Sequence, residues 1–169
     1  LALRTADTTT HQDLLVRFDE AVRAALEGIL GSPLSSSQWL QASLPYSHGG
    51  FGLRLARSHG SAAYIASVSA SQPLVQEIRR GQQVGIQEEE GQDASHQLPS
   101  AAALEDLNSL LGDPLTIEEV TALTQRELSA LVDAEASNRL LQETVDVREL
   151  ARLRCVRREG AGDWLCALP

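Results

Sequence analysis

The chain has 169 residues, only 4% of them aromatic, and a formal net charge of −9. That length allows one hydrophobic core or two small ones, and a core with few aromatic side chains favours helices over a β-sandwich. No apolar run approaches the roughly 20 residues that span a bilayer, and the first ten residues lack the basic and apolar blocks of a signal peptide. We therefore expect an all-α, intracellular protein, cytoplasmic or nuclear, with no membrane partner.

The sequence predicts seven or eight short helices in two lobes, residues 1–80 and 100–169, joined by an acidic flexible linker over residues 81–99. The first helix runs from about His11 to Leu30, with Thr9 and Gln12 as its capping box. Its apolar side chains recur every three or four residues and form one stripe, which consists of Leu14, Leu15, Phe18, Val22, Leu26, Ile29 and Leu30.

Three more helices are predicted in the first lobe. The second covers residues 36–43 and is capped by Ser35 and Gln38, and a proline at position 45 ends it. The third starts at residue 54 or 58, contains a break at Gly60, and ends near residue 71. Pro73 then occupies the first turn of a fourth helix, which reaches residue 80.

A glycine-rich turn, Gly49-Gly50-Phe51-Gly52, separates the second helix from the third. It could be read as a phosphate-binding loop, but no Lys follows it and no strand clearly precedes it. We interpret it instead as a tight structural turn that needs positive φ angles, with Phe51 tucked into the core.

The segment over residues 81–99 combines low hydrophobicity with acidic residues and many Gln and Gly residues. Residues 81–146 hold 14 acidic residues and only two arginines. Glu88, Glu89, Glu90, Asp93 and His96 could be imagined as a site for a hard cation, but consecutive acids in a flexible run seldom converge on one ion. We expect a solvated linker there.

The second lobe carries repeated helix-start signals. Helices are predicted over residues 101–111, around 117–123, over 125–143 and over 147–157, and the lobe is expected to be truncated at its C-terminus. Ser100 is a cap for the first of these, and Thr116 with Glu119 and Thr124 with Glu127 form capping boxes for the next two.

Arginine supplies every basic side chain, because the chain has no lysine. The one basic cluster is Arg148, Arg152, Arg154, Arg157 and Arg158, and a weaker pair is Arg54 and Arg57. These residues are candidate nucleic-acid contacts, since guanidinium groups bind phosphate through two hydrogen bonds. The alternative is a solvated helix face that interacts with the C-terminal end of the helix dipole.

The order of segments between residues 18 and 74 is distinctive. It comprises an amphipathic helix, a Gly-Ser-Pro stop, a short helix with a tryptophan, a Leu-Pro break, the glycine turn and a helix of small residues. This order resembles the segment that follows the polymerase domain in reverse-transcriptase-like proteins of non-LTR retrotransposons. The matching positions are 18–19, 29–34, 38–39, 42–45 and 49–54, and later 151–153, 160–162 and 164–169.

The resemblance implies a non-catalytic fragment of an RNA-directed DNA polymerase. Polymerases of this family hold divalent metal with an Asp-Asp turn, and no two aspartates are adjacent in this chain. The two cysteines, Cys155 and Cys166, are too few for the four ligands of a structural zinc site. They could pair in an oxidising compartment, but we expect two free buried thiols. We predict no catalytic residue, no metal site and no cofactor.

The implied role is to support the polymerase architecture or to position nucleic acid. The expected partner is the upstream polymerase domain of the same protein, and nucleic-acid binding by this acidic chain alone is expected to be weak and lost near physiological salt. Two alternatives remain open at this point: a freestanding helical protein-interaction module, and a non-functional relic of such an element.

Overall fold

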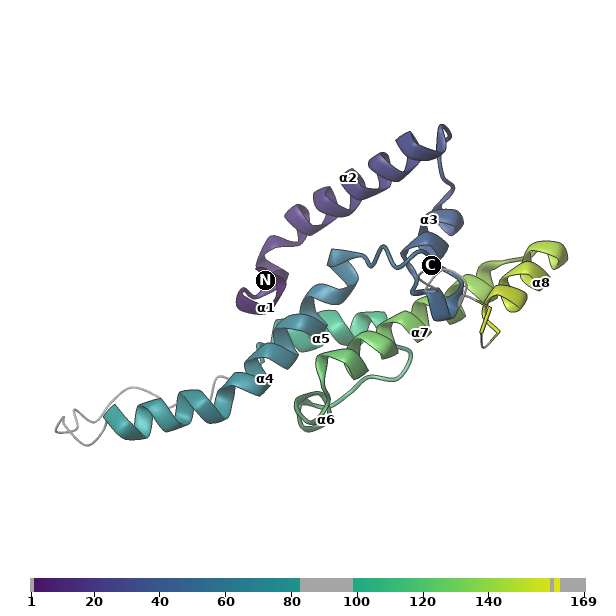
Figure 1. Ribbon diagram of the computed structural model, residues 1–169. Helices are drawn as coiled ribbons and strands as arrows, with labels where there is room; N and C mark the ends of the chain where they lie inside the picture. Colours follow the sequence, from purple (N-terminus) through teal and green to yellow (C-terminus); the bar gives the residue numbers. More distant parts are fainter. Residues whose placement is uncertain (1, 83–98, 159, 162–169) are drawn as a thin grey trace.

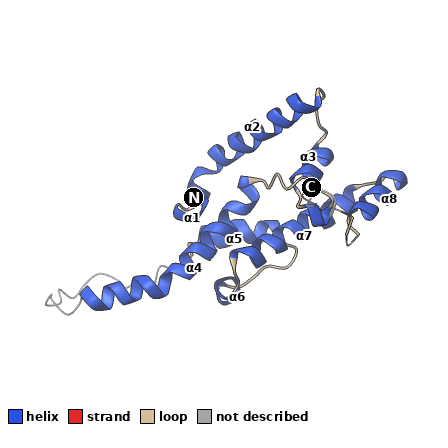
Figure 2. Ribbon diagram, viewed as in Figure 1, coloured by secondary structure: helices blue, strands red, loops and turns tan. Residues whose placement is uncertain are grey.

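The computed structural model describes residues 2–82, 99–158 and 160–161, and every regular element in these ranges is helical (Figures 1 and 2). The expected all-α class is therefore confirmed, with eight α-helices and two short 3₁₀ helices in the described residues. No helix in these ranges is both long and apolar enough to cross a membrane.

The chain starts with α1 (Ala2–Thr5), the 3₁₀ helix η1 (Thr8–His11) and α2 (Gln12–Leu30). The predicted capping box at Thr9 and Gln12 is wrong, because α2 begins without a side-chain cap. Asp7 instead accepts a hydrogen bond from the Thr9 amide and caps η1. Gly31, with a φ of 69°, ends α2 in the left-handed conformation as expected.

The second predicted helix is confirmed at the predicted bounds as α3 (Ser36–Ser43). Ser35 and Gln38 form its capping box, and each side chain satisfies the other residue's backbone amide. A 3₁₀ turn, η2 (Tyr46–His48), follows directly after Pro45. This short segment leads into the glycine turn.

The third and fourth predicted helices are one helix, α4 (Ala56–Gln82), with Pro73 inside it. Gly60 is not a break either. A Cβ atom at that position would lie 2.9 Å from the Thr8 hydroxyl, so the glycine lets η1 approach α4 closely. Local sequence rules missed this contact, because Thr8 is 52 residues away along the chain.

The second half contains α5 (Ala101–Leu110), α6 (Ile117–Ala122), α7 (Gln125–Glu143) and α8 (Val147–Val156). The predicted cap at Ser100 and both predicted capping boxes are present. Asp146 caps α8 by accepting hydrogen bonds from two backbone amides. Where the predicted and observed ends of these helices differ, the difference is one residue.

The two halves share one core and do not pack as separate lobes. The main cluster combines α4 with α5, α6 and α7, and its buried members are Ala62, Ile65, Ala66, Ala103, Leu107, Val120, Leu128 and Val132. A smaller cluster joins Leu44, at the end of α3, with Leu140 of α7 and Leu153 of α8. Residues 83–98, which hold nearly all of the predicted acidic linker and the imagined cation site, lie outside the described residues.

Candidate functional site

The glycine turn is held against the end of α3. The amides of Gly50, Phe51 and Gly52 donate hydrogen bonds to the carbonyl oxygens of Pro45, Ala42 and Leu44, at 3.1, 3.0 and 2.8 Å. Gly49 and Gly52 have φ angles of 77° and 73°, which glycine adopts without strain. Two of the three glycines in this tight turn therefore have the positive φ angles that the sequence analysis expects of it.

The prediction that Phe51 enters the core is wrong, since its side chain is 53% exposed. The hydrogen bonds of the turn fix its backbone along α3, and the phenyl ring lines a surface groove instead. The sequence alone could not predict which way the Phe51 side chain points, because that depends on where α2 and α8 lie.

Helix α8 packs onto the same turn. A Cβ atom at Gly49 would lie 2.9 Å from Cβ of Val156, so only glycine allows this approach. Burial lowers the pKa of His48, the positive charge of Arg157 lowers it further, and Asp133 opposes both. The end of α8 thus brings one arginine of the predicted basic cluster to the residue before the turn.

Arg152 reaches the turn through Gln41. Its guanidinium donates a hydrogen bond to the side-chain oxygen of Gln41 at 2.6 Å. The side-chain nitrogen of Gln41 in turn donates to the Gly49 carbonyl oxygen at 3.1 Å. Arg152 also pairs with Glu149, and hydrogen bonding to that carboxylate raises the arginine's pKa against a smaller opposing effect of burial. The turn and the basic cluster, distant in sequence, therefore meet at this point.

These residues border a groove of about 330 Å³ between α2, α3, the glycine turn and α8. Its apolar wall consists of Leu26, Leu30, Leu34 and Phe51, and its polar wall of Gln38, Gln41, Glu149 and Arg152. A groove of this size and mixed character fits a bulky side chain or a small ligand. We take it as the candidate functional site.

The other candidate arginines do not converge on this groove. Arg148, Arg154 and Arg158 are exposed, and no ion pair is formed by their side chains within the described part of the chain. Arg54 is bound to Asp133 at 2.7 Å. The Arg57 side chain is exposed beside Asp19, Glu20 and Arg23 of α2.

Asp133 is an ion-pairing residue that sequence reasoning missed. It is only 3% exposed, and it pairs with Arg54 and, at 3.3 Å, with Nε2 of His59. The sequence did hold an indication of this role, because a charged residue on the same helix face as the apolar Leu128 and Val132 needs a partner when it is buried. The adjoining cavity measures about 30 Å³, about the space of one water molecule, so this cluster joins α7 to α4 and has no room for a substrate.

The described residues also include potential metal ligands and one thiol. Within residues 2–82, 99–158 and 160–161, no group of three or more His, Cys, Asp or Glu side chains is arranged to hold a metal ion. Cys155 is exposed, so the prediction of a buried thiol is wrong for this residue. Cys166 lies outside the described residues.

Helix α2 is amphipathic, yet none of its residues is buried. Leu14, Phe18, Ile29 and Leu30 are 52%, 59%, 83% and 51% exposed, although all four belong to the predicted apolar stripe. In Figure 1, α2 lies along the edge of the molecule, on the side away from α6. The other three stripe residues, Leu15, Val22 and Leu26, are partly buried, so the described residues cover the stripe only in part.

Comparison of the chain with protein-family models, with curated proteins and with solved structures finds no match.

Proposed function

We propose that this chain is a non-catalytic helical segment of a reverse-transcriptase-like retrotransposon protein, and that it packs through α2 against the polymerase part of that intracellular protein. The proposal draws on the order of segments around the glycine turn. One structural observation carries it: four of the seven apolar stripe residues of α2 are more than half exposed. The absence of adjacent aspartates restricts the proposed role to support.

The stripe is displayed by a helix that is otherwise well anchored. The Asp19 carboxylate accepts hydrogen bonds from the amides of Ala56 and Arg57 at 2.7 and 3.1 Å, and so caps α4 from a distant part of the chain. Near its other end, Glu27 binds Arg23 and the Leu34 amide. These contacts hold one side of α2 to the fold and leave Leu14, Phe18, Ile29 and Leu30 of the stripe more than half exposed.

Covering the stripe would be strongly favourable. Full burial of a Leu, Ile or Phe side chain stabilises an association by about 1.5–3 kcal/mol, and four such side chains are more than half exposed here. Clusters of exposed apolar side chains are typical of interaction sites in soluble proteins. The groove beside the glycine turn extends this surface, because Leu26 and Leu30 belong to both.

A secondary role in nucleic-acid positioning follows from the exposed arginines of α8. Arg148, Arg154 and Arg158 have no ion-pair partner within the described residues and could contact phosphates. The net charge of −9 opposes independent binding. We therefore assign these arginines to contacts made once the polymerase part already holds the nucleic acid.

The proposal is tested by producing the 169-residue chain separately from the polypeptide encoded upstream in the same reading frame, and by titrating one with the other. We expect saturable binding that Phe18→Glu weakens at least tenfold, a change of about 1.4 kcal/mol that is typical of an interface hot spot.

Ile78→Glu is the matched control, because Ile78 is an apolar residue of similar exposure on α4, 53% against 59% for Phe18. It should leave the affinity unchanged. Absence of binding, or equal loss with both variants, would reject the proposed α2 interface.

A further inference from the structure

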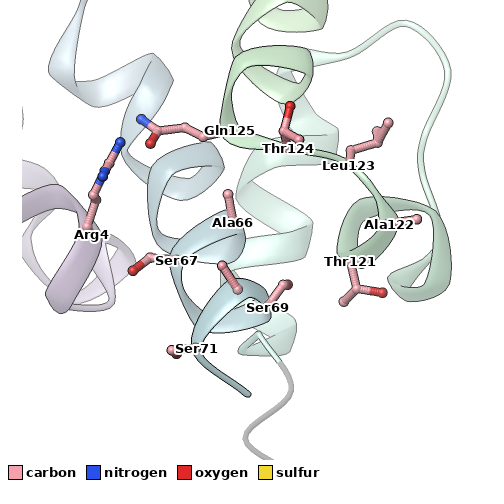
Figure 3. A pocket seen from close by; sticks show the side chains of 11 residues that line it. Arg4, Ala66, Ser67, Ser69, Ser71, Thr121, Ala122, Leu123, Thr124 and Gln125 are labelled. Atoms are coloured by element: carbon pink, nitrogen blue, oxygen red, sulfur yellow. The ribbon is translucent and has the colours of Figure 1, made fainter. Parts of the chain in front are cut away.

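A second groove lies beside the middle of α4 and shares no lining residue with the groove at the glycine turn. It measures about 610 Å³ and is bordered by α1, the middle of α4 and the junction of α6 with α7 (Figure 3). Its volume lies in the range of small-molecule sites. Neither the proposed function nor the predicted arginine cluster involves any of its residues.

Three polar side chains in this groove are free to bind a ligand. Arg4, Ser67 and Gln125 line it, and none of them has a hydrogen-bond or ion-pair partner among the described residues. Figure 3 shows the Arg4 and Gln125 side chains extending towards each other across the groove, with Ser67 below them. They come from α1, α4 and α7, so the fold brings together residues that are far apart in sequence.

The other hydroxyl groups of the groove are already engaged. Ser69, Ser71 and Thr121 donate to carbonyl oxygens of their own helices at 2.9, 3.0 and 3.0 Å. Thr124 donates to the Glu127 carboxylate at 2.7 Å. Donors for a new ligand are therefore concentrated at Arg4, Ser67 and Gln125.

The electrostatic character of the groove is the reverse of that of the chain. Among the described residues that line it, Arg4 is the one charged side chain and none carries a carboxylate, although the protein carries a net charge of −9. An Arg guanidinium has five N–H donors and cannot lose its charge at physiological pH. The floor of the groove is apolar, formed by Ala66, Ala70, Ala122 and Leu123.

We propose that this groove binds a small organic anion. Its phosphate or carboxylate group accepts hydrogen bonds from Arg4, Gln125 and Ser67, and its apolar body lies over the alanine floor. The volume of about 610 Å³ exceeds what a bare oxyanion fills, which is why the ligand carries an organic body. This site is independent of the α2 interface.

The test is a nuclear magnetic resonance titration of the full chain with inorganic phosphate and, separately, with acetate, against sodium chloride at matched ionic strength. We expect saturable shifts of the Gln125 side-chain amide and of the Ser67 amide with at least one of the two anions. Saturation by phosphate alone assigns a phosphorylated ligand, and saturation by acetate alone assigns a carboxylate.

Two variants and a control make the result specific. Arg4→Gln should weaken binding at least tenfold, because it removes charge-assisted hydrogen bonds, and Ala70→Phe should weaken binding of an organic anion such as phenyl phosphate by filling the floor. Arg17→Gln, at an exposed arginine of α2 outside the groove, should bind as wild type. Absence of saturable shifts with both anions, or unchanged binding by Arg4→Gln, would overturn the proposal.

Discussion

At the scale of single residues, Gly50 and Gly28 have opposite surroundings. A Cβ atom at Gly50 would overlap the Leu44 carbonyl oxygen and lie 2.5 Å from that of Gln41, and neither backbone group can move aside. A Cβ atom at Gly28, on the open side of α2, would meet nothing within 4 Å. We expect Gly50→Ala to lower the free energy of unfolding by roughly 1–3 kcal/mol.

Gly28→Ala is the control for this prediction. It should raise the free energy of unfolding by up to about 1 kcal/mol, because alanine is the better helix former. Urea denaturation monitored by circular dichroism measures both values. Equal effects of the two substitutions would contradict the described packing of the turn.

Asp133 provides a second prediction at this scale. Asp133→Asn removes the buried charge that pairs with Arg54 and His59, and we expect it to lower the free energy of unfolding by about 1.5–3 kcal/mol. Glu149→Gln breaks the ion pair with Arg152, in which both side chains are more than 40% exposed, and should change stability little. If both variants have the same stability, Asp133 does not join α7 to α4.

At the scale of elements, the core-packed part of α4, residues 62–66, and its C-terminal end should differ in how fast their amides exchange with solvent. Core residues lie between Ala62 and Ala66, whereas no side chain from Ser67 to Gly81 is buried, and Figure 1 shows this end extending beyond the other helices. Pro73 also removes one helical hydrogen bond. We expect amides 74–81 to exchange with solvent faster than amides 62–66 in a hydrogen-exchange experiment.

Pro73→Ala tests the cause of this difference. Proline costs a helix interior roughly 3 kcal/mol relative to alanine, so the variant should slow exchange of amides 74–81 at least tenfold and leave amides 62–66 unchanged. Unchanged exchange at 74–81 would mean that the lack of side-chain burial, and not Pro73, makes this end of α4 labile.

Elements with local signals were predictable, and elements decided by distant contacts were not. Ser35, Thr116 and Thr124 cap their helices where the sequence places them, because a capping box needs only four consecutive residues. Gly60 was read as a helix break from its low helix propensity, but it lies inside α4, where its close contact with Thr8 requires a glycine. Pro73 was read as a helix start, and α4 continues through it although no side chain around it is buried.

At the scale of the whole molecule, polar contacts join residues on both sides of the 83–98 segment. Asp7 accepts a hydrogen bond from Ser100, and Asp106 accepts hydrogen bonds from Ser61 and from Gln12, the latter at 3.2 Å. Burial works to raise the pKa of Asp7, but hydrogen bonds from Ser100 and Thr9 outweigh it and hold the pKa below its ordinary value of 3.8. The charged form of Asp7 is therefore favoured by folding.

This shift predicts the direction of a pH effect. Because the pKa of Asp7 is lower in the folded chain, its contribution to stability is present above about pH 4 and is lost as the pH falls through the folded value. Ser100→Ala should therefore destabilise the protein more at pH 6 than at roughly pH 2.5, measured by urea unfolding. Ser109→Ala removes a hydroxyl that donates to a backbone carbonyl, and its effect should not depend on pH.

The candidate site shows the same limit of sequence reasoning at a larger scale. The glycine turn and Arg152 were both identified from sequence, but their meeting through Gln41 depends on the packing of α8 against α3. Arg54 was predicted to be available for phosphate and is instead paired with Asp133. The groove at Arg4 had no local signal, because its three free polar side chains come from three helices.

The central claim is that this chain is a supporting segment of a reverse-transcriptase-like protein. The most direct measurement is long-read sequencing of the transcript that encodes it. The account predicts an in-frame upstream palm domain that contains an adjacent Asp-Asp pair in a Tyr/Phe-x-Asp-Asp turn. A transcript in which this segment has its own start codon, with stop codons in frame immediately upstream, would contradict the claim and indicate a freestanding module or a relic.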